Sequence, residues 1–247
     1  MKVNSEVEKL VTEVKEVALK AGARSLGADL VGVVSAADID TYPRQWVGWY
    51  IQDYTKKTTE IMPDAKSIVV IGSHVWDYIL ETALKKKDEW VYPGYFPLFT
   101  QTRKVAFFLR AKGYKAVSFP HLSLKKLAQL AGFGAFGKNA LIINPKFGPW
   151  IRLGAVLTNA EMAFDKPFEQ DLCGDCDDCI KACPVGALTP YKVNDAKCLV
   201  GIHLTGTEIS KYTEVLRRYE PSLTKKSHLM CIECQKVCKY GKKERML

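Results

Sequence analysis

The 247-residue sequence predicts an α/β (α+β) domain over residues 1–166, followed by a smaller cysteine-rich domain over residues 167–247. Two observations support this division. Short β-branched apolar runs alternate with helical patterns through the first part, as in domains that layer helices on a sheet. All eight cysteines follow residue 172. A chain of this length can bury a core without covalent cross-links, so the cysteines are expected to serve chemistry rather than stability.

The predicted elements of the first part begin with an amphipathic helix over residues 5–22, for which Ser5 and Glu8 form a capping box. The apolar, β-branched runs are expected to be strands covered on both faces. The segment 46–62 is aromatic and has no clear period. The remaining predicted elements are strands over 29–34, 67–71, 114–117, 140–144 and 150–158, and helices over 102–112 and 123–131.

The sequence begins without a charged and apolar leader, and it contains no apolar run near the roughly 18 residues that a membrane-spanning helix requires. We therefore expect a cytoplasmic protein with no membrane association. Cytoplasmic thiols stay reduced, which favours metal binding by the cysteines over a disulfide framework.

The first four cysteines follow the pattern C-x-x-C-x-x-C-x-x-x-C-P, ending at Pro184. Bacterial ferredoxins with two cubane clusters use this run, in which three thiolates bind one cluster and the fourth binds the other. The later cysteines form a second, interrupted run. The crossover rule predicts one 4Fe-4S cluster on Cys173, Cys176, Cys179 and Cys238, and a second on Cys183, Cys198, Cys231 and Cys234.

The interval 199–230 between the halves of the second run is expected to be a helical insertion. Two tetrahedral zinc sites are the alternative use of eight cysteines, but the close triple followed by Cys-Pro disfavours zinc. The formal net charge is +9. Two oxidised clusters on eight thiolates would remove about four positive charges, so the charge does not decide between an acidic electron carrier, an anionic cofactor and RNA.

The segment Gly132-Phe-Gly-Ala-Phe-Gly137 matches the G-x-G-x-x-G pattern of dinucleotide-binding proteins. That pattern should follow a strand and open a helix, whereas here it follows a predicted helix and precedes a predicted strand. A nucleotide site is therefore disfavoured.

The longer string LAQLAGFGAFGKNALIINPKFGPWIRLGAVLTNAEM, at 127–162, is followed by the ferredoxin-type run. Together they resemble the family of cobalamin-dependent iron-sulfur reductases that contains epoxyqueuosine reductases and reductive dehalogenases. The resemblance implies a cobalamin-binding domain of nitroreductase-like type, followed by a ferredoxin-like domain with two 4Fe-4S clusters. It also implies a base-off corrinoid without a protein axial ligand, reduced through the clusters to a cob(I)alamin-like state.

The resemblance further implies which residues contact the corrinoid. Glycines at 132, 134, 137, 148 and 154 would let the backbone approach a flat macrocycle, and basic or amide side chains would meet its amide groups and phosphate. The expected cofactor-binding residues are Gly134, Gly137, Lys138, Asn139, Leu141, Arg152 and Gly154.

The sequence departs from both subfamilies at the proton donor. Epoxyqueuosine reductases carry an aspartate about a dozen residues before the A-G-x-G segment, and here that position is Ser118. Reductive dehalogenases use a tyrosine. Tyr95 is therefore the first candidate acid, Tyr92 the second, and His121 a third that could also hold a cofactor amide.

The predicted function is a cobalamin-dependent reductase that takes single electrons from a ferredoxin or flavodoxin and reduces a small organic substrate. Reduction of epoxyqueuosine in tRNA is kept as an alternative, disfavoured by the serine at position 118. The third hypothesis is a non-catalytic electron-transfer or corrinoid-reactivating protein.

Overall fold

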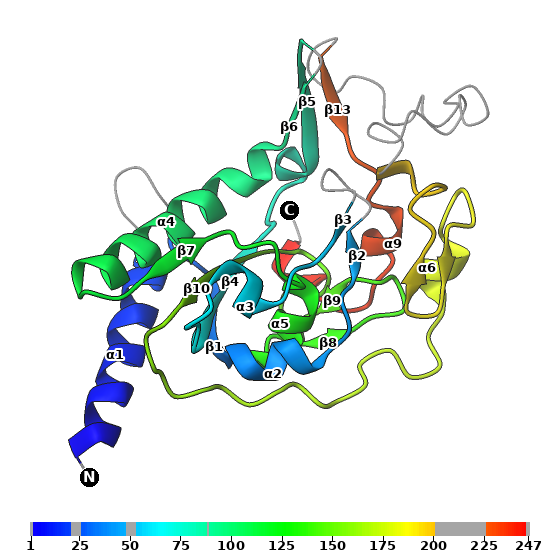
Figure 1. Ribbon diagram of the computed structural model, residues 1–247. Coiled ribbons are helices and arrows are strands. Elements are labelled where there is room, and N and C mark those ends of the chain that lie inside the picture. Colours follow the sequence, from blue (N-terminus) through cyan, green and yellow to red (C-terminus); the bar gives the residue numbers. More distant parts are fainter. Residues whose placement is uncertain (1, 21–25, 48–52, 88, 201–225, 246–247) are drawn as a thin grey trace.

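A four-stranded antiparallel sheet forms the centre of the computed structural model, which describes residues 2–20, 26–47, 53–87, 89–200 and 226–245 (Figure 1). Val69 lies opposite Val33 on one neighbouring strand and Val156 on the other, and all three side chains are fully buried. The prediction of strands covered on both faces is confirmed. In spatial order the strands are β1 (Leu30–Ser35), β4 (Ser67–His74), β10 (Ile151–Thr158) and β7 (Ala116–Ser118).

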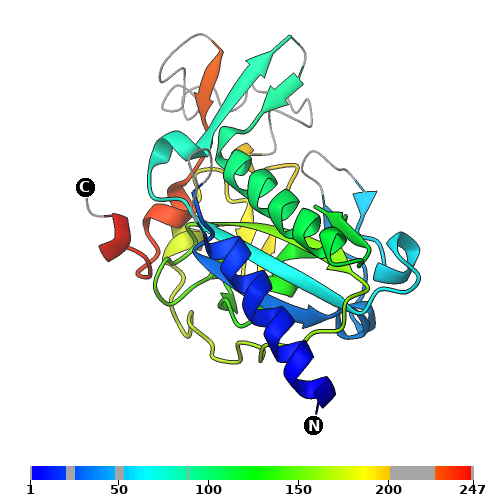
Figure 2. The same cartoon turned by 90° about the vertical axis from the view of Figure 1, so that its left-hand side faces the viewer.

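Helices cover both faces of this sheet. On one face α1 (Lys2–Leu19) and α4 (Phe96–Ala111) lie side by side and bury their apolar stripes against it (Figure 2). On the other face α2 (Ala36–Thr41) and α5 (Leu124–Leu130) contribute to a second apolar cluster. The three layers confirm the mixed α/β fold class, and the antiparallel pairing makes it an α+β arrangement.

Two helices begin earlier than their sequence patterns predict. α1 is already helical at Lys2, so the predicted capping box at Ser5 is wrong. α4 begins at Phe96 with Pro97 in its first turn, where proline needs no hydrogen-bond partner, and the 3-10 turn η2 (Pro93–Tyr95) leads into it.

Short elements fill the connections of the first part. In chain order they are β2 (Trp46–Val47), β3 (Asp53–Tyr54), α3 (Thr58–Ile61), β8 (Ala135–Phe136) and β9 (Ile142–Ile143). The segment 132–137 follows α5 and leads into the β8–β9 hairpin, as predicted, so it does not open a helix.

A three-stranded sheet projects from the molecule and joins its two parts (Figure 1). In spatial order its strands are β13 (Ser227–Leu229), β5 (Thr82–Lys86) and β6 (Glu89–Val91). The 3-10 turn η1 (Tyr78–Glu81) comes directly before β5 in the chain. The prediction of a helical insertion over 199–230 is therefore wrong at 227–229, because β5 offers backbone partners to that segment. Residues 201–225 of the insertion lie outside the described residues.

The chain leaves the central sheet along a segment that is bonded to the first part. The Asp165 carboxylate accepts the Val33 backbone N–H at 2.8 Å and the Lys15 ammonium at 2.9 Å. Beyond it lie α6 (Asp178–Lys181), β11 (Leu188–Thr189), β12 (Lys192–Val193), α9 (Glu233–Lys236) and η4 (Lys243–Arg245). The domain division at residue 166 stays a prediction, since β13 pairs back onto β5.

The helices described here are all too short or too polar to cross a lipid bilayer.

Two glycines face each other where the C-terminal segment meets the first part. A Cβ built on Gly148 would lie 2.2 Å from the Tyr240 carbonyl oxygen, and one on Gly241 would lie 2.3 Å from the Phe147 carbonyl oxygen. Both glycines also adopt positive φ angles, of 60° and 79°. The two backbones can touch only because neither residue has a side chain.

We expect Gly148→Ala to destabilise the reconstituted protein by more than the roughly 1 kcal/mol that an alanine at positive φ costs, because the Cβ displaces Tyr240. The control is Gly113→Ala, at φ 89° with no atom within 4 Å of the added Cβ. Anaerobic urea unfolding followed by circular dichroism measures both. Equal losses in the two variants would show that the close contact is unimportant.

Candidate functional site

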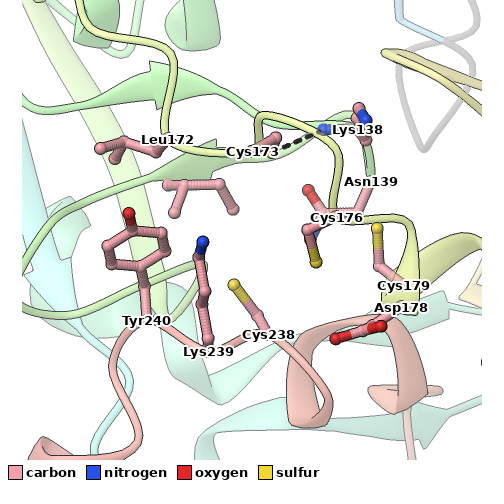
Figure 3. A pocket seen from close by; sticks show the side chains of 11 residues that line it. Lys138, Asn139, Leu172, Cys173, Cys176, Asp178, Cys179, Cys238, Lys239 and Tyr240 are labelled. Carbon is pink, nitrogen blue, oxygen red and sulfur yellow. Dashed lines mark hydrogen bonds between the residues drawn. The ribbon is translucent and has the colours of Figure 1, made fainter.

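Four thiols surround a pocket between the C-terminal segment and the turn after β8. Cys176, Cys179 and Cys238 point into the space that Cys173 borders (Figure 3). The thiol of Cys179 interacts electrostatically with the other three. The same pocket is lined by Lys138, Asn139, Ile143, Leu172, Asp178, Lys239 and Tyr240.

Local hydrogen bonds explain how the first thiols are held. The Asp171 carboxylate accepts the backbone N–H of Cys173 at 2.9 Å and that of Gly174 at 3.2 Å. The Cys176 N–H donates to the Cys173 carbonyl at 3.0 Å, which closes a tight turn between the two cysteines. An N–H from the first part also reaches this group, since Lys138 donates to the Cys173 Sγ at 3.4 Å. Hydrogen bonds to cluster sulfurs are one of the determinants of cluster potential.

The other four thiols form a second group. Cys234, on α9, interacts electrostatically with Cys231, Cys198 and Cys183, and also with Cys179 of the first group. The Ala187 N–H donates to the Cys183 Sγ at 3.2 Å. The structure thus brings the eight cysteines into the two sets of four that the crossover rule predicts, and the two sets are neighbours. Their role as ligands stays a prediction.

The environment of these thiols favours their protonated forms in the metal-free protein. Burial, followed by the neighbouring Cys173, Cys176 and Cys238, raises the pKa of Cys179 to about 11. Burial is also the largest cause of the raised pKa values of Cys234 and Cys238. Thiolates bind metals, so cluster assembly must displace these protons and becomes easier as the pH rises.

Among the described His, Cys, Asp and Glu side chains, no three are arranged to hold a single metal ion.

The glycine-rich segment contacts protein rather than an open space. A Cβ on Gly134 would lie 2.1 Å from the Ile143 carbonyl oxygen, and one on Gly137 would lie 2.6 Å from the Ile143 side chain. These glycines allow the tight β8–β9 hairpin, and Gly148 allows the contact with Tyr240. The absence of a side chain at Gly134, Gly137 and Gly148 thus makes room for protein atoms, and the expected contact of these glycines with a macrocycle stays a prediction.

The polar residues of that segment lie at the first thiol group. The Lys138 ammonium donates to the Gly174 carbonyl at 2.6 Å, and Lys138 and Asn139 both line the pocket of the four thiols. The Asn139 side chain accepts the Leu141 N–H at 3.1 Å. The structure thus places Lys138, Asn139 and Leu141 in the turn that meets the cysteine-rich part. Their expected contacts with a corrinoid stay predictions.

Arg152 lies in a different place, in a buried polar cluster at the start of β10. Its guanidinium forms an ion pair with Glu81, and their side chains are 16% and 2% exposed. Burial is the largest single influence and lowers the pKa of Arg152, but the charge and hydrogen bond of Glu81 together with Tyr95 outweigh it, so the net pKa is raised. The guanidinium also lies over the Tyr95 ring, 5.3 Å from its centroid. Gly154, two residues along the strand, packs beneath Thr102 and Phe119.

The three candidate acids are not brought together as one set. Tyr95 contacts Arg152 and, through Phe99, an aromatic row that reaches Phe119. Burial and then Tyr95 raise the pKa of Tyr92 to about 12, so Tyr92 keeps its proton at neutral pH but is a weak acid.

His121 belongs to another segment, where its carbonyl accepts the Lys56 N–H at 2.9 Å. Its Nε2 is enclosed and has no hydrogen-bond partner among the described residues. Ser118 lies three residues before it, on β7 opposite Val156.

Sequence analysis missed two charged residues that lie partly or wholly inside the protein, the buried Glu81 and the partly buried Lys125. Glu81 ends a mainly apolar run, Tyr78-Ile-Leu-Glu81, and Lys125 is one of two adjacent lysines on α5. An acid after apolar residues is a weak signal, and the two lysines cannot be distinguished without knowing which one faces inward.

We expect Glu81→Ala to lower the free energy of unfolding by about 3–5 kcal/mol, because it leaves the Arg152 guanidinium buried without a counter-charge. Replacing both residues, as Glu81→Leu with Arg152→Met, should restore most of that loss. The control is Lys66→Ala, whose exposed pair with Glu161 contributes at most about 1 kcal/mol. Urea denaturation measures all three, and a double variant no more stable than Glu81→Ala would argue against a buried-pair effect.

Comparison with known proteins agrees with this architecture. Residues 172–241 match the model of a 4Fe-4S double cluster binding domain. An epoxyqueuosine reductase from Bacillus cereus is 27% identical over 246 residues, covering 89% of this chain, and the chain spans only 63% of that protein's length.

Two solved structures share the fold. An epoxyqueuosine reductase bound to an epoxyqueuosine-modified tRNA stem loop aligns with 97% of this chain at a TM-score of 0.64 and 22% identity, covering 66% of that structure. A catabolic reductive dehalogenase complexed with 3-bromo-4-hydroxybenzoic acid aligns with 96% at a TM-score of 0.56 and 18% identity, covering 36% of that structure. The double-cluster domain, the sequence similarity and the shared fold make this chain similar to the iron-sulfur epoxyqueuosine reductases, and in fold also to the reductive dehalogenases.

Proposed function

We propose that the protein is a cobalamin-dependent reductase that carries single electrons through two 4Fe-4S clusters and reduces epoxyqueuosine in tRNA. The observation that carries the proposal is the packing of two neighbouring groups of four thiols against an α+β domain with this fold. Two clusters move electrons one at a time and perform no bond chemistry themselves, so the α+β domain must hold the group that does. A ferredoxin or flavodoxin is the proposed electron donor.

The described residues around Arg152 suit an amide-rimmed, flat cofactor. Glu81 Oε1 and Arg152 Nε are buried polar atoms with no hydrogen-bond partner among the described residues. The aromatic row from Tyr95 to Phe119 lies beside them. In the proposal these side chains hold a corrinoid, which supplies strongly reducing chemistry when bound. Arg152 and Tyr95 orient its polar groups, and the aromatic row packs on its apolar face.

Sequence analysis favoured a small organic substrate, and the present proposal replaces that substrate with epoxyqueuosine in tRNA. The epoxyqueuosine reductase from Bacillus cereus aligns with most of this chain. The serine at position 118 remains an obstacle, because a hydroxyl is a poor acid. His121 is the proposed replacement, since it lies three residues further on and has an enclosed Nε2 with no hydrogen-bond partner among the described residues.

A small organic substrate is the second candidate. The specific observation in its favour is the contact between Arg152 and Tyr95, which places a cation beside a phenol that could donate a proton. A positive charge next to a phenol favours the phenolate and so makes the tyrosine a better acid.

The test is anaerobic reconstitution with iron, sulfide and cobalamin, followed by turnover of epoxyqueuosine-containing tRNA with a chemical reductant. We expect about eight irons and one cobalt per chain, and cobalt-dependent formation of queuosine. His121→Ala should abolish turnover while leaving the metal content unchanged. Bound cobalt without turnover of the tRNA would favour the small-molecule candidate. Eight irons without cobalt would leave an electron-transfer protein, and zinc in place of iron would overturn the proposal.

The crossover assignment has its own test, based on paired cysteine variants. Cys183→Ser and Cys231→Ser should leave the same remaining cluster, because both residues belong to the second group. Cys179→Ser and Cys238→Ser should leave the other one. Electron paramagnetic resonance of the reduced variants compares them. A Cys183→Ser spectrum that matches Cys179→Ser would show that the first run binds a single cluster without crossover.

A further inference from the structure

Two aromatic side chains lie exposed on the β2–β3 hairpin, within the aromatic segment that follows α2. Trp46 is 50% exposed and Tyr54 is 54% exposed. The two residues lie opposite each other across the paired strands, and their rings meet edge to face with centroids 5.3 Å apart. Apolar surface that gathers in one exposed place, unlike a single exposed side chain, marks a binding surface.

Hydrogen bonds fix the base of this hairpin to the first part of the chain. The Thr55 N–H donates to the Gln45 carbonyl at 2.9 Å, and the Gln45 N–H donates to the Thr55 hydroxyl at 3.0 Å. The Ser123 hydroxyl donates to the side-chain oxygen of Gln45. The Lys56 N–H donates to the His121 carbonyl at 2.9 Å. The hairpin is therefore bonded to the loop that carries His121, the proposed acid.

The hairpin is also bonded to the cysteine-rich part. The indole N–H of Trp46 donates to the Asp195 carboxylate at 3.1 Å. Asp195 lies in a turn that ends at Cys198, whose N–H donates to the Asn194 carbonyl at 3.0 Å. This bond restrains the Trp46 ring although half of its surface faces water. A side chain that is ordered in advance loses less conformational freedom when a partner binds to it.

A shallow pocket beside the hairpin is lined by three cations, Arg44, Lys56 and Lys57, and none of its described lining residues is Asp or Glu. Glu60 pairs with Arg44 at 2.7 Å and so offsets its charge. The Lys57 ammonium bonds to two backbone carbonyls. Lys56 is exposed, and no described residue forms a hydrogen bond with its ammonium. The pocket therefore suits a single anionic group rather than a highly charged surface.

This combination of features favours RNA over an acidic electron carrier. Proteins that bind unpaired nucleotides stack the bases on exposed aromatic rings and meet the phosphates with cations. Two carboxylates, Asp53 and Asp195, lie next to the rings in sequence or in contact. They would repel an acidic protein that covered the rings, whereas the stacking of a base needs no positive charge there.

We propose that Trp46 and Tyr54 form a stacking platform for an unpaired base of the tRNA loop, with a phosphate of that loop at the pocket of Arg44, Lys56 and Lys57. The platform binds a nucleotide beside the reacting one, because the hairpin is bonded to the loop of the proposed acid. The contact involves no covalent step. This inference rests on the proposed function in that the substrate is tRNA, and goes beyond it by naming the surface that binds the loop.

The test is the affinity of the reconstituted protein for a fluorescently labelled, unmodified tRNA anticodon stem loop, measured anaerobically by fluorescence anisotropy. Trp46→Ala should weaken binding about tenfold, equivalent to about 1.4 kcal/mol, because it removes a stacking surface. Trp46→Phe loses the bond to Asp195 but keeps a ring, so its affinity should stay within about threefold of the wild type.

The salt dependence of binding separates stacking from charge. Lys56→Met should reduce the slope of log affinity against log salt concentration by about 0.7, the value for one phosphate contact of a single strand. Trp46→Ala should leave that slope unchanged, because stacking releases no counterion.

Two further variants complete the design. Trp76→Ala is the matched control, because Trp76 is also 50% exposed but follows the end of β4 that lies away from α2. It should change neither the affinity nor the slope. Tyr54→Ala removes the other ring without breaking the bond between Trp46 and Asp195. It should weaken binding about tenfold while the iron and cobalt contents equal those of the wild type.

The remaining outcomes are decided by affinity and metal content together. Wild-type affinity in both Trp46→Ala and Tyr54→Ala overturns the proposal, as does loss of iron in both, which would show a structural role. Unchanged RNA affinity with less cobalt would assign the rings to the corrinoid, and unchanged RNA affinity with slower reduction by a flavodoxin would assign them to the electron donor. Either result overturns the proposal.

Binding is measured without turnover, so the inference and the proposed function can fail separately. A protein that binds the stem loop through Trp46 but forms no queuosine refutes the proposed activity and supports the platform. A wild-type protein that forms queuosine, and whose Trp46→Ala variant binds the stem loop equally well, supports the activity and overturns the platform.

Discussion

The docking of residues 226–241 onto the first part is the constraint on which the rest of the structure depends. Cys231 and Cys234 belong to one thiol group and Cys238 belongs to the other, so this one segment completes both. Three contacts hold it. β13 pairs with β5, Ile232 packs fully buried beside Val75 and Trp150, and Gly241 meets Gly148. The α+β domain therefore controls the geometry of both clusters, although it supplies none of the eight cysteines.

This dependence gives the glycine-rich segment its physical explanation. Its glycines let the β8–β9 hairpin close tightly, and the closed hairpin presents Lys138 to the cysteine-rich part. A motif that matches a nucleotide-binding pattern thus serves contact between two parts of one chain. Close backbone approach needs glycine whatever the partner is, so the pattern alone does not identify the partner.

Sequence analysis was most successful where the signal is local. The buried strands β1, β4 and β10 follow from β-branched apolar runs, and the grouping of the thiols follows from spacing alone. The β5–β6–β13 sheet could not be predicted, because its third strand comes from residues about 140 positions later and carries no clear alternation. The Glu81–Arg152 pair was missed for the same reason, since 71 residues separate two charges whose proximity only the fold creates. Arg152 itself was identified through the family resemblance, which could not reveal its counter-charge.

The pairing of β13 with β5 links the chemistry of the metal to the solubility of the protein. Among the described strands, β5 lies between β13 and β6, so without β13 it is an edge strand. β13 ends two residues before Cys231, so movement of the segment that carries the thiols of Cys231 and Cys234 also affects β13. Oxygen damage to a cluster would therefore loosen β13 and leave the backbone of β5 unpaired. Exposed edge strands pair readily with other chains, so we expect the oxidised protein to be lost by aggregation as well as by loss of electron transfer.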